Sequence, residues 1–270
     1  MNTEAKLDIA VCTLGQKGLD RFASTNPPAI PQVRYVVSMQ SFEGVKIPET
    51  IAEREDVVIF ECSEKGLSAN RNNALEKCTA ELVLIADDDV MFDKDGIIAA
   101  IKSIESEKDI ALATFIVKRP SMPDYPDSPC ILGKKRLPKG YWPVSVEIMV
   151  RRELVREIRF DTRLGLVNEL MSCGEELRFV QVARRRDLKC KFFPIIIGEH
   201  PAVSTGLRVT PGIIRAQGCY IALEYGRLAC IPRLWLKAYR ILRQNPHTNP
   251  LKTLLYLHQG QYHSLKFPYC

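Results

Sequence analysis

The sequence predicts an α/β fold with a mostly parallel central sheet. Short runs of apolar and β-branched residues alternate with segments of helical pattern through the first 120 residues. This alternation is typical of parallel strands that are joined by helices. The chain has 270 residues, of which 46% are hydrophobic, so it can form one large or two small domains with a substantial core.

Local patterns predict the individual elements. Apolar runs predict strands at residues 9–13, 33–38, 57–60, 82–86, 110–117, 144–150 and 189–198. Helical patterns predict helices at residues 67–78, 95–107, 152–158 and 175–187. Ser68 is a suitable N-cap for the first of these helices. The segment 120–143 has six prolines and no clear period, which predicts a long loop.

Composition narrows the class of protein and its compartment. The net charge is +6, within the ordinary range for globular proteins. No apolar run approaches the roughly 18 residues that cross a bilayer, and the first residues do not resemble a signal peptide. The nine cysteines include no Cys-x-x-Cys pair, which favours a reducing compartment over a disulfide framework or a zinc site. We therefore expect a cytoplasmic protein.

The charge is unevenly distributed along the chain. Residues 207–270 contain nine Lys or Arg and one acid, which leaves 29 basic and 31 acidic residues in 1–206. We predict a main domain at 1–206 and a basic helical extension at 207–270. In the extension, a helix at 233–243 would place apolar and basic side chains on opposite faces: Leu234, Trp235, Ala238, Ile241 and Leu242 against Arg233, Lys237, Arg240 and Arg243.

Two interpretations of this extension remain open. The helix can pack on the main domain and keep a solvated basic face, or it can attach to an anionic membrane surface. Nucleic-acid binding is not expected, because no aromatic platform or known motif accompanies the charge.

Three consecutive acids, Asp87, Asp88 and Asp89, directly follow the apolar run 82–86. Ligands of open α/β sheets bind at the carboxyl ends of the strands. A divalent cation relieves the repulsion between clustered carboxylates, and hard oxygen ligands suit Mg²⁺ or Mn²⁺. The alternative is an acidic turn that only contacts solvent.

Three further segments carry candidate functional groups. Gly66 to Leu75 opens a helix in which Arg71 could reach a phosphate, although a capped surface helix explains the same pattern. Glu175 and Glu176 begin another helix, where acids complement the helix dipole but can also act as a base. His200 follows the last predicted strand and is either structural or a metal ligand.

In this order and spacing, these segments resemble family 2 glycosyltransferases of the GT-A fold, a Rossmann-like sheet flanked by helices. The resemblance covers roughly residues 7–206. It is carried by the strand that ends near Thr13, the Gly-Leu-Ser-x-Asn-Arg-Asn-x-Ala-Leu segment from Gly66, the Asp cluster, Phe160-Asp161 through Leu164-Gly165, Gly174-Glu175-Glu176 and Glu199-His200. Such enzymes move a sugar from a nucleotide donor to an acceptor hydroxyl with inversion.

The resemblance implies roles for these residues. Thr13 would border the nucleotide base, Arg71 would contact the nucleotide, and Asp87 and Asp88 would lie at the donor. A divalent ion, Mn²⁺ or Mg²⁺, would be held by carboxylates among Asp87, Asp88 and Asp89, with His200 completing the shell. Glu176 would be the catalytic base, with Glu175 as the substitute candidate. The partners would be a UDP- or GDP-sugar and a glycan or lipid-linked glycan.

The sequence departs from the family pattern in two places. Residues 38–44 lack the Asp-Gly-Ser type segment that helps to read the nucleotide, so the base of the donor is not predicted. The expected catalytic Asp is replaced by Glu176. Two other functions stay open: a metal-dependent phosphohydrolase that uses the Asp cluster, and a non-catalytic module that binds sugar nucleotides or glycans.

Overall fold

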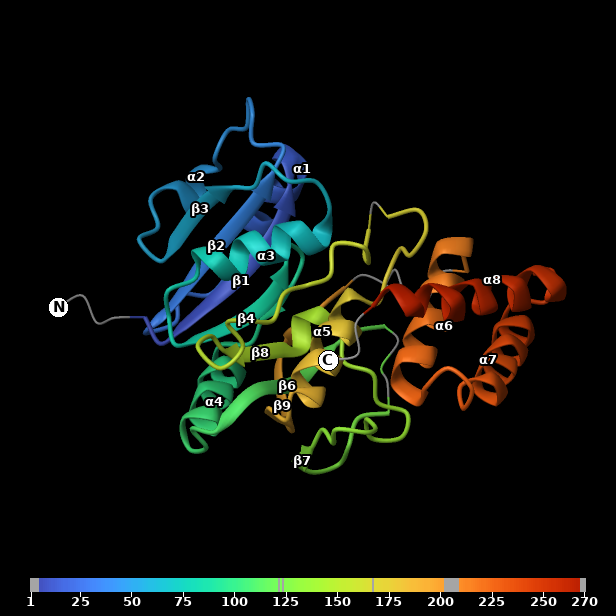
Figure 1. Ribbon diagram of the computed structural model, residues 1–270. Coiled ribbons are helices and arrows are strands. Elements are labelled where there is room, and N and C mark those ends of the chain that lie inside the picture. The colour runs from blue at the N-terminus through green and yellow to red at the C-terminus, as the bar shows by residue number, and fades with distance from the viewer. Residues whose placement is uncertain (1–4, 121, 123, 167, 202–208, 268–270) are drawn as a thin grey trace.

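The computed structural model describes residues 5–120, 122, 124–166, 168–201 and 209–267, and its centre is a mixed sheet (Figure 1). The strands lie in the order β3-β2-β1-β4-β8-β6-β9-β5, with β7 paired to β9. The first half of the sheet is parallel and contains β1 (Leu7–Leu14), β2 (Val33–Gln40), β3 (Val57–Glu61) and β4 (Leu82–Asp87). The predicted α/β fold with a mostly parallel sheet is confirmed.

The second half of the sheet contains the antiparallel pairs. β8 (Ile148–Arg151) runs antiparallel to both of its neighbours, β4 and β6 (Ile110–Lys118). β9 (Lys189–Glu199) is parallel to β6 and extends along its whole length. The two-residue strands β5 (Met91–Phe92) and β7 (Cys130–Ile131) pair antiparallel with β9.

Helices cover both faces of the sheet, and its strands are therefore buried on both sides. One core contains Leu7, Ile9 and Val11 of β1 together with side chains from α1 (Gly15–Ser24) and α4 (Lys94–Glu105). The other contains Ala10 and Cys12 of β1 with side chains from α3 (Leu67–Lys77) and α5 (Glu175–Arg185). The short helix α2 (Glu49–Ala52) precedes β3. Two-sided burial explains why the strands are nearly continuous apolar runs.

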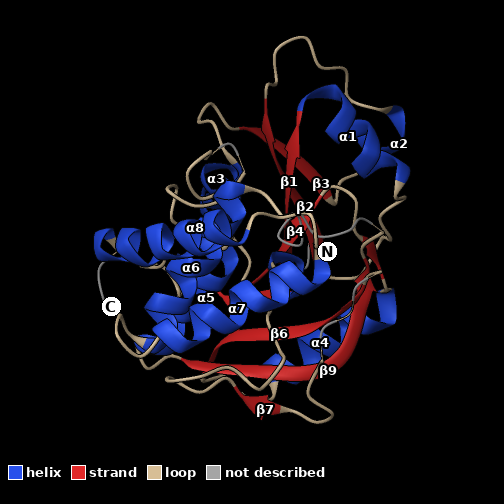
Figure 2. Ribbon diagram, turned by 90° about the vertical axis from the view of Figure 1, so that its right-hand side faces the viewer, coloured by secondary structure: helices blue, strands red, loops and turns tan. Residues whose placement is uncertain are grey.

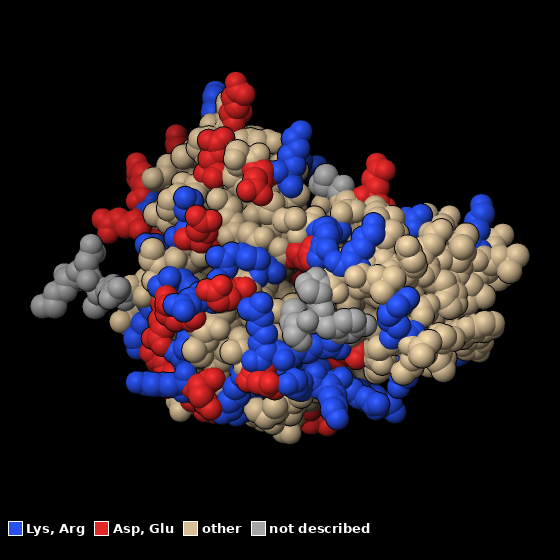
Figure 3. All heavy atoms as spheres, viewed as in Figure 1, with Lys and Arg blue, Asp and Glu red and all other residues tan. Residues whose placement is uncertain are grey.

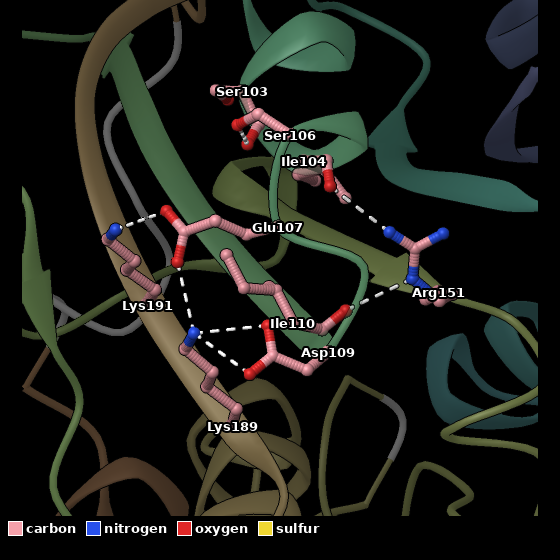
Figure 4. A network of polar contacts seen from close by, with 9 residues as sticks. All are labelled: Ser103, Ile104, Ser106, Glu107, Asp109, Ile110, Arg151, Lys189 and Lys191. Atoms are coloured by element: carbon pink, nitrogen blue, oxygen red, sulfur yellow. Dashed lines mark hydrogen bonds and ion pairs between the residues drawn. The ribbon is translucent and has the colours of Figure 1, made fainter.

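A polar network fixes the corner between α4 and β6 (Figure 4). Glu107 lies between Lys189 and Lys191 of β9, with contacts of 3.0 and 2.5 Å. Arg151 of β8 donates hydrogen bonds to the carbonyl oxygens of Ile104 and Ile110. The end of α4 and the start of β6 are therefore tied to the two strands that flank β6.

Three C-terminal helices form a separate unit at the right of Figure 1: α6 (Pro211–Tyr225), α7 (Ile231–Gln244) and α8 (Pro250–His263). They share an apolar core of their own, and α6 and α8 pack closely through Gly218 and Gly260. In the part of the chain that is described, no helix is long and apolar enough to cross a membrane.

The unit also packs on the main domain through its last residues. Phe267 lies under the guanidinium of Arg163, 4.1 Å from the ring centroid, and Arg163 donates a 2.6 Å hydrogen bond to the carbonyl oxygen of Lys266. The predicted domain boundary at 206/207 falls in the segment 202–208, outside the described residues.

Some predicted elements are wrong or incomplete. Residues 152–158 form turns instead of a helix, and the predicted strand 144–150 begins with a 3-10 turn at Ser145–Glu147. The predicted amphipathic helix exists as α7, but Trp235 is not on its packed face: its side chain is 59% exposed, whereas Leu234, Ala238 and Ile241 are buried. The predicted helical character of the C-terminal region is confirmed, although α6 and α8 were not predicted individually, and α1 and α2 were not predicted at all.

Replacing Gly260 by Ala should destabilise the C-terminal helices. A Cβ atom at Gly260 would lie 1.9 Å from the carbonyl oxygen of Arg215, so α6 and α8 would have to separate. Overpacking costs about 1–3 kcal/mol and should outweigh the gain of roughly 1 kcal/mol in helix propensity. Urea unfolding measures the change. Gly133→Ala is the control, because its Cβ would meet no atom closer than 3.5 Å; equal stability of both variants would contradict the packing.

Candidate active site

The candidate site lies at the carboxyl ends of β1 and β4. These strands are paired in parallel, with Cys12 opposite Asp87, so Thr13 and the Asp cluster leave the same edge of the sheet. The N-termini of α3 and α5 reach this edge from the other side, because Arg71 of α3 contacts both Asp87 and Glu175 of α5. The sheet order therefore gathers residues that are up to about 160 positions apart in the chain.

Asp88 is buried and already has two partners. Its carboxylate accepts a 2.7 Å hydrogen bond from the Thr13 hydroxyl and another of 2.7 Å from Nε of Arg21 in α1. Burial raises the pKa of Asp88, and the bonds from Thr13 and Arg21 only partly oppose this shift. Gly18 allows α1 to approach so closely, since a Cβ there would lie 2.2 Å from the Thr13 hydroxyl oxygen. Asp88 therefore joins β1, α1 and the Asp cluster.

Arg71 is the charged centre of the site. Its side chain is 3% exposed, and its guanidinium contacts Glu175 at 2.7 Å, Asp87 at 3.1 Å and the Ser145 hydroxyl at 2.8 Å. Burial opposes the charge of Arg71, but Asp87 and Glu175 outweigh it and raise the pKa of the guanidinium. Arg71 thus remains a cation and links α3 with β4, α5 and the turn before β8.

The two glutamates of α5 differ in environment. Glu175 is buried and paired with Arg71. Glu176 is partly buried, and no described residue forms a salt bridge with it. Burial and the adjacent Glu175 carboxylate raise the pKa of Glu176 to about 8. The pair therefore contains one carboxylate that is bound by Arg71 and one group, Glu176, that can gain or lose a proton near neutral pH.

Asp89 and His200 lie together at the other side of the Asp cluster. Nε2 of His200 is 3.1 Å from Oδ1 of Asp89, and β9 brings His200 to this position. Burial opposes ionisation of Asp89, but the contact and charge of His200 prevail and lower the pKa of the carboxyl. The His200 ring is therefore the neighbour that faces Oδ1 of Asp89.

These donors fit a divalent ion that also binds the substrate. Among the described residues, no group of three or more His, Cys, Asp or Glu side chains could hold a metal alone. Mg²⁺ commonly takes one or two protein carboxylates together with phosphate oxygens and water. Asp89 and His200, whose side chains lie 3.1 Å apart, supply such a partial set. Asp87 and Asp88, which the sequence analysis also considered as ligands, are paired with Arg71 and Arg21.

The segment after Phe160 closes the site between α3 and α5. Ser68 donates a 2.8 Å hydrogen bond to the carbonyl oxygen of Leu164, and a Cβ at Gly165 would lie 3.2 Å from the Glu175 carboxyl carbon. Asp161 is bound by Arg163, and although burial opposes it, this contact lowers the pKa of Asp161. Asp161 therefore stabilises the turn.

The structure brings all eight predicted site residues to one sheet edge, through partners that the sequence analysis did not predict. Arg21 and Ser145 are the main omissions, because each is more than 60 positions from the residue it contacts. Ser145 also lies in a 3-10 turn where a strand was predicted. Asn70 was part of the recognised segment, but its bonds to Ser38 and to the Thr13 carbonyl oxygen were not predicted.

One segment of the chain matches a known family in sequence. Residues 45–162 match the model of glycosyl transferase family 2, so this segment is similar to that family. The match begins after β2 and ends just past Asp161, so it includes Arg71 and the Asp cluster, whereas Glu175, Glu176 and His200 lie beyond it. None of the curated proteins matches the chain in sequence.

Solved structures of other proteins share the fold of this chain. Residues 1–349 of S. aureus TarS in complex with UDP superimpose with a TM-score of 0.56 at 15% identity, covering 80% of this chain and 65% of the TarS fragment. The chain thus spans less than two thirds of that fragment. The mannosyltransferase PcManGT from Pyrobaculum calidifontis, in complex with GDP-Man and Mn²⁺, gives 0.56 at 13% identity and covers 98% of this chain and 88% of its own.

Removing the cation at the centre of the site should destabilise the protein. Arg71→Gln leaves Glu175 and Asp87 without their buried partner. Breaking a buried pair in this way costs about 3–5 kcal/mol, which chemical denaturation measures. Adding Glu175→Gln should restore part of the loss. As a control, Arg156→Gln removes an exposed pair with Glu157 and should cost less than about 1 kcal/mol; a similar cost at position 71 would contradict the role of Arg71.

Proposed function

We propose that the protein is an inverting, divalent-metal-dependent glycosyltransferase that uses a nucleotide-sugar donor. The observation that carries this proposal is the separation of roles among the acids of one site. Glu176 is a proton acceptor with a pKa of about 8, and Asp89 with His200 forms a donor set for a metal. The family match supports sugar transfer, and the structural neighbours in complex with UDP and GDP-Man support a UDP- or GDP-sugar as the donor class.

Glu176 is the proposed catalytic base. Inversion requires one carboxylate to take the proton of the acceptor hydroxyl as its oxygen attacks the anomeric carbon. The bond to the nucleoside diphosphate breaks on the opposite side, and the electron pair leaves with the diphosphate. Glu175 is less suited to this step, because its carboxylate is buried against Arg71. We propose that Glu175 is a positioning residue, which holds Arg71 and Glu176 in place.

Asp89 and His200 would hold the divalent ion, and the ion would stabilise the negative charge that develops on the leaving diphosphate. We propose that Thr13 and Asp88 line the nucleotide side of the donor pocket, where Arg21 and the Thr13 hydroxyl fix the Asp88 carboxylate. Arg71 is buried, so we assign it a positioning role for Asp87 and Glu175 instead of a direct contact with the donor.

The proposed acceptor is a hydroxyl of a glycan or a lipid-linked glycan, and the proposed compartment is the cytoplasm. A phosphohydrolase is less consistent with the site, because Asp87 and Asp88 are paired with arginines and neither is available as a nucleophile. A non-catalytic binding module would not need a carboxyl group with a pKa as high as that of Glu176.

Donor binding should depend on a divalent ion and on Asp89. Calorimetric titration of UDP- and GDP-sugars should detect binding of one nucleotide class in the presence of Mn²⁺. Asp89→Asn should weaken that binding at least about tenfold, because the ion would lose its only charged protein ligand in the proposed set. Asp93→Asn is the matched control, since that residue caps α4 by a bond to the Gly96 amide. The proposal would be overturned if a sugar nucleotide binds equally well without a metal, or if no sugar nucleotide binds at all.

Transfer should increase with pH up to about 8. Below the raised pKa of Glu176 most molecules carry a protonated base, so kcat/KM should fall about tenfold for each pH unit under that value. Glu175→Gln removes the neighbouring negative charge and should move the midpoint of the profile to lower pH. Glu176→Gln should abolish transfer while leaving donor binding intact. A profile that is flat between pH 6 and about 8 would contradict the assignment of the base.

A further inference from the structure

The start of α7 exposes a cluster of large apolar side chains. Five such residues lie within the twelve positions 228–239, and their exposed fractions are high: Leu228 84%, Ile231 37%, Trp235 59%, Leu236 49% and Tyr239 61%. We call them the α7 face. Ile231, Trp235 and Tyr239 are spaced by four residues and therefore form one row along the helix. Contiguous exposed apolar surface on a soluble protein usually marks an interaction site.

The α7 face is not the face that stabilises the fold. Leu234, Ala238 and Ile241 point into the core of the helical unit, which is complete without the exposed row. In Figure 1 α7 lies at the far right-hand end of the molecule, and that end faces the viewer in Figure 2. Ile231, Trp235 and Tyr239 are exposed, so this row of α7 faces solvent.

The charge around the α7 face is entirely basic. Arg227, Arg240 and Arg243 are exposed at its borders, and the described segment 225–267 contains no Asp or Glu. Figure 3 shows the same composition, with tan and blue spheres at the right-hand end of the molecule. Lys237 belongs to the inner side, where burial lowers its pKa. Apolar and aromatic residues bordered by Arg are typical of helices that lie in the interface of an anionic bilayer.

We propose that the α7 face binds the surface of a membrane that contains anionic lipids. Trp235 and Tyr239 would insert among the acyl chains and head groups, with Leu228, Ile231 and Leu236 beside them. Arg240 and Arg243 would contact lipid phosphates. A second copy of the chain is a weaker candidate, because a two-fold contact would bring the same arginines of both copies together without an acid to pair them.

Binding of α7 to a membrane would also indicate where the acceptor is found. This part of the inference rests on the proposed function. A protein held on the membrane by α7 would meet lipid-linked acceptors at the same surface. The lipid contact itself depends only on the α7 face, so a vesicle assay without any turnover tests it separately from sugar transfer.

Sedimentation of the full chain with phosphatidylcholine vesicles, with and without phosphatidylglycerol, tests the proposal. The wild type should bind the anionic vesicles, and added salt should weaken this binding. Trp235→Ser/Tyr239→Ser should lower the partition coefficient at least about tenfold. Arg240→Gln/Arg243→Gln should lower it by about thirtyfold, and only on anionic vesicles. These side chains are exposed, so the variants should retain the wild-type unfolding transition.

Matched controls replace exposed apolar and basic side chains that lie outside the α7 face. Ile131→Ser replaces a 55% exposed apolar residue of β7, and Lys102→Gln/Lys108→Gln removes two exposed cations at the end of α4. Both should bind vesicles as the wild type does. Equal losses in the controls, or no binding of the wild type to anionic vesicles, would overturn the proposal. A concentration-dependent dimer that Trp235→Ser dissociates would also overturn it, because the α7 face would then be a contact between chains.

Discussion

The rest of the site depends on the contacts that the buried guanidinium of Arg71 forms. It contacts Asp87 at the end of β4, Glu175 at the start of α5 and Ser145 before β8. A cation with 3% exposure is stable only while such partners replace its lost hydration. The contacts of Arg71 therefore hold the end of β4, the start of α5 and the turn before β8 in a fixed arrangement. The order of the strands brings these elements near one another but does not align them.

Two arginines give different roles to acids that are alike in the sequence. Arg71 pairs with Glu175, whereas burial and the adjacent Glu175 carboxylate raise the pKa of Glu176 to about 8. Arg21 pairs with Asp88, whereas the next acid, Asp89, contacts His200. In each case one carboxylate is fixed by an arginine and its neighbour is left for chemistry. The candidate base, Glu176, and the candidate metal ligand, Asp89, are thus each adjacent in the sequence to an acid that an arginine binds.

The sequence was most informative where one local pattern determines the structure. Strands buried on both faces are continuous apolar runs, so β1 to β4 and β6 were predictable. Helix α6 was missed because Gly212 and Gly218 lower its local preference, although close packing on α8 needs the second of them. Trp235 was misplaced because helical periodicity does not say which of two adjacent stripes meets the core. The site residues were predictable from their types and order, but contacts such as Arg21–Asp88 depend on tertiary structure alone.

The titration of Glu176 itself tests the account most directly. Carboxyl ¹³C chemical shifts of the glutamate-labelled protein, with the Glu176 signal assigned by its loss in Glu176→Gln, report the protonation of this one group. If Glu176 is the base, the midpoint should lie near 8 in the wild type and lower in Glu175→Gln. A midpoint close to the ordinary glutamate value of about 4.3 in both proteins would contradict it.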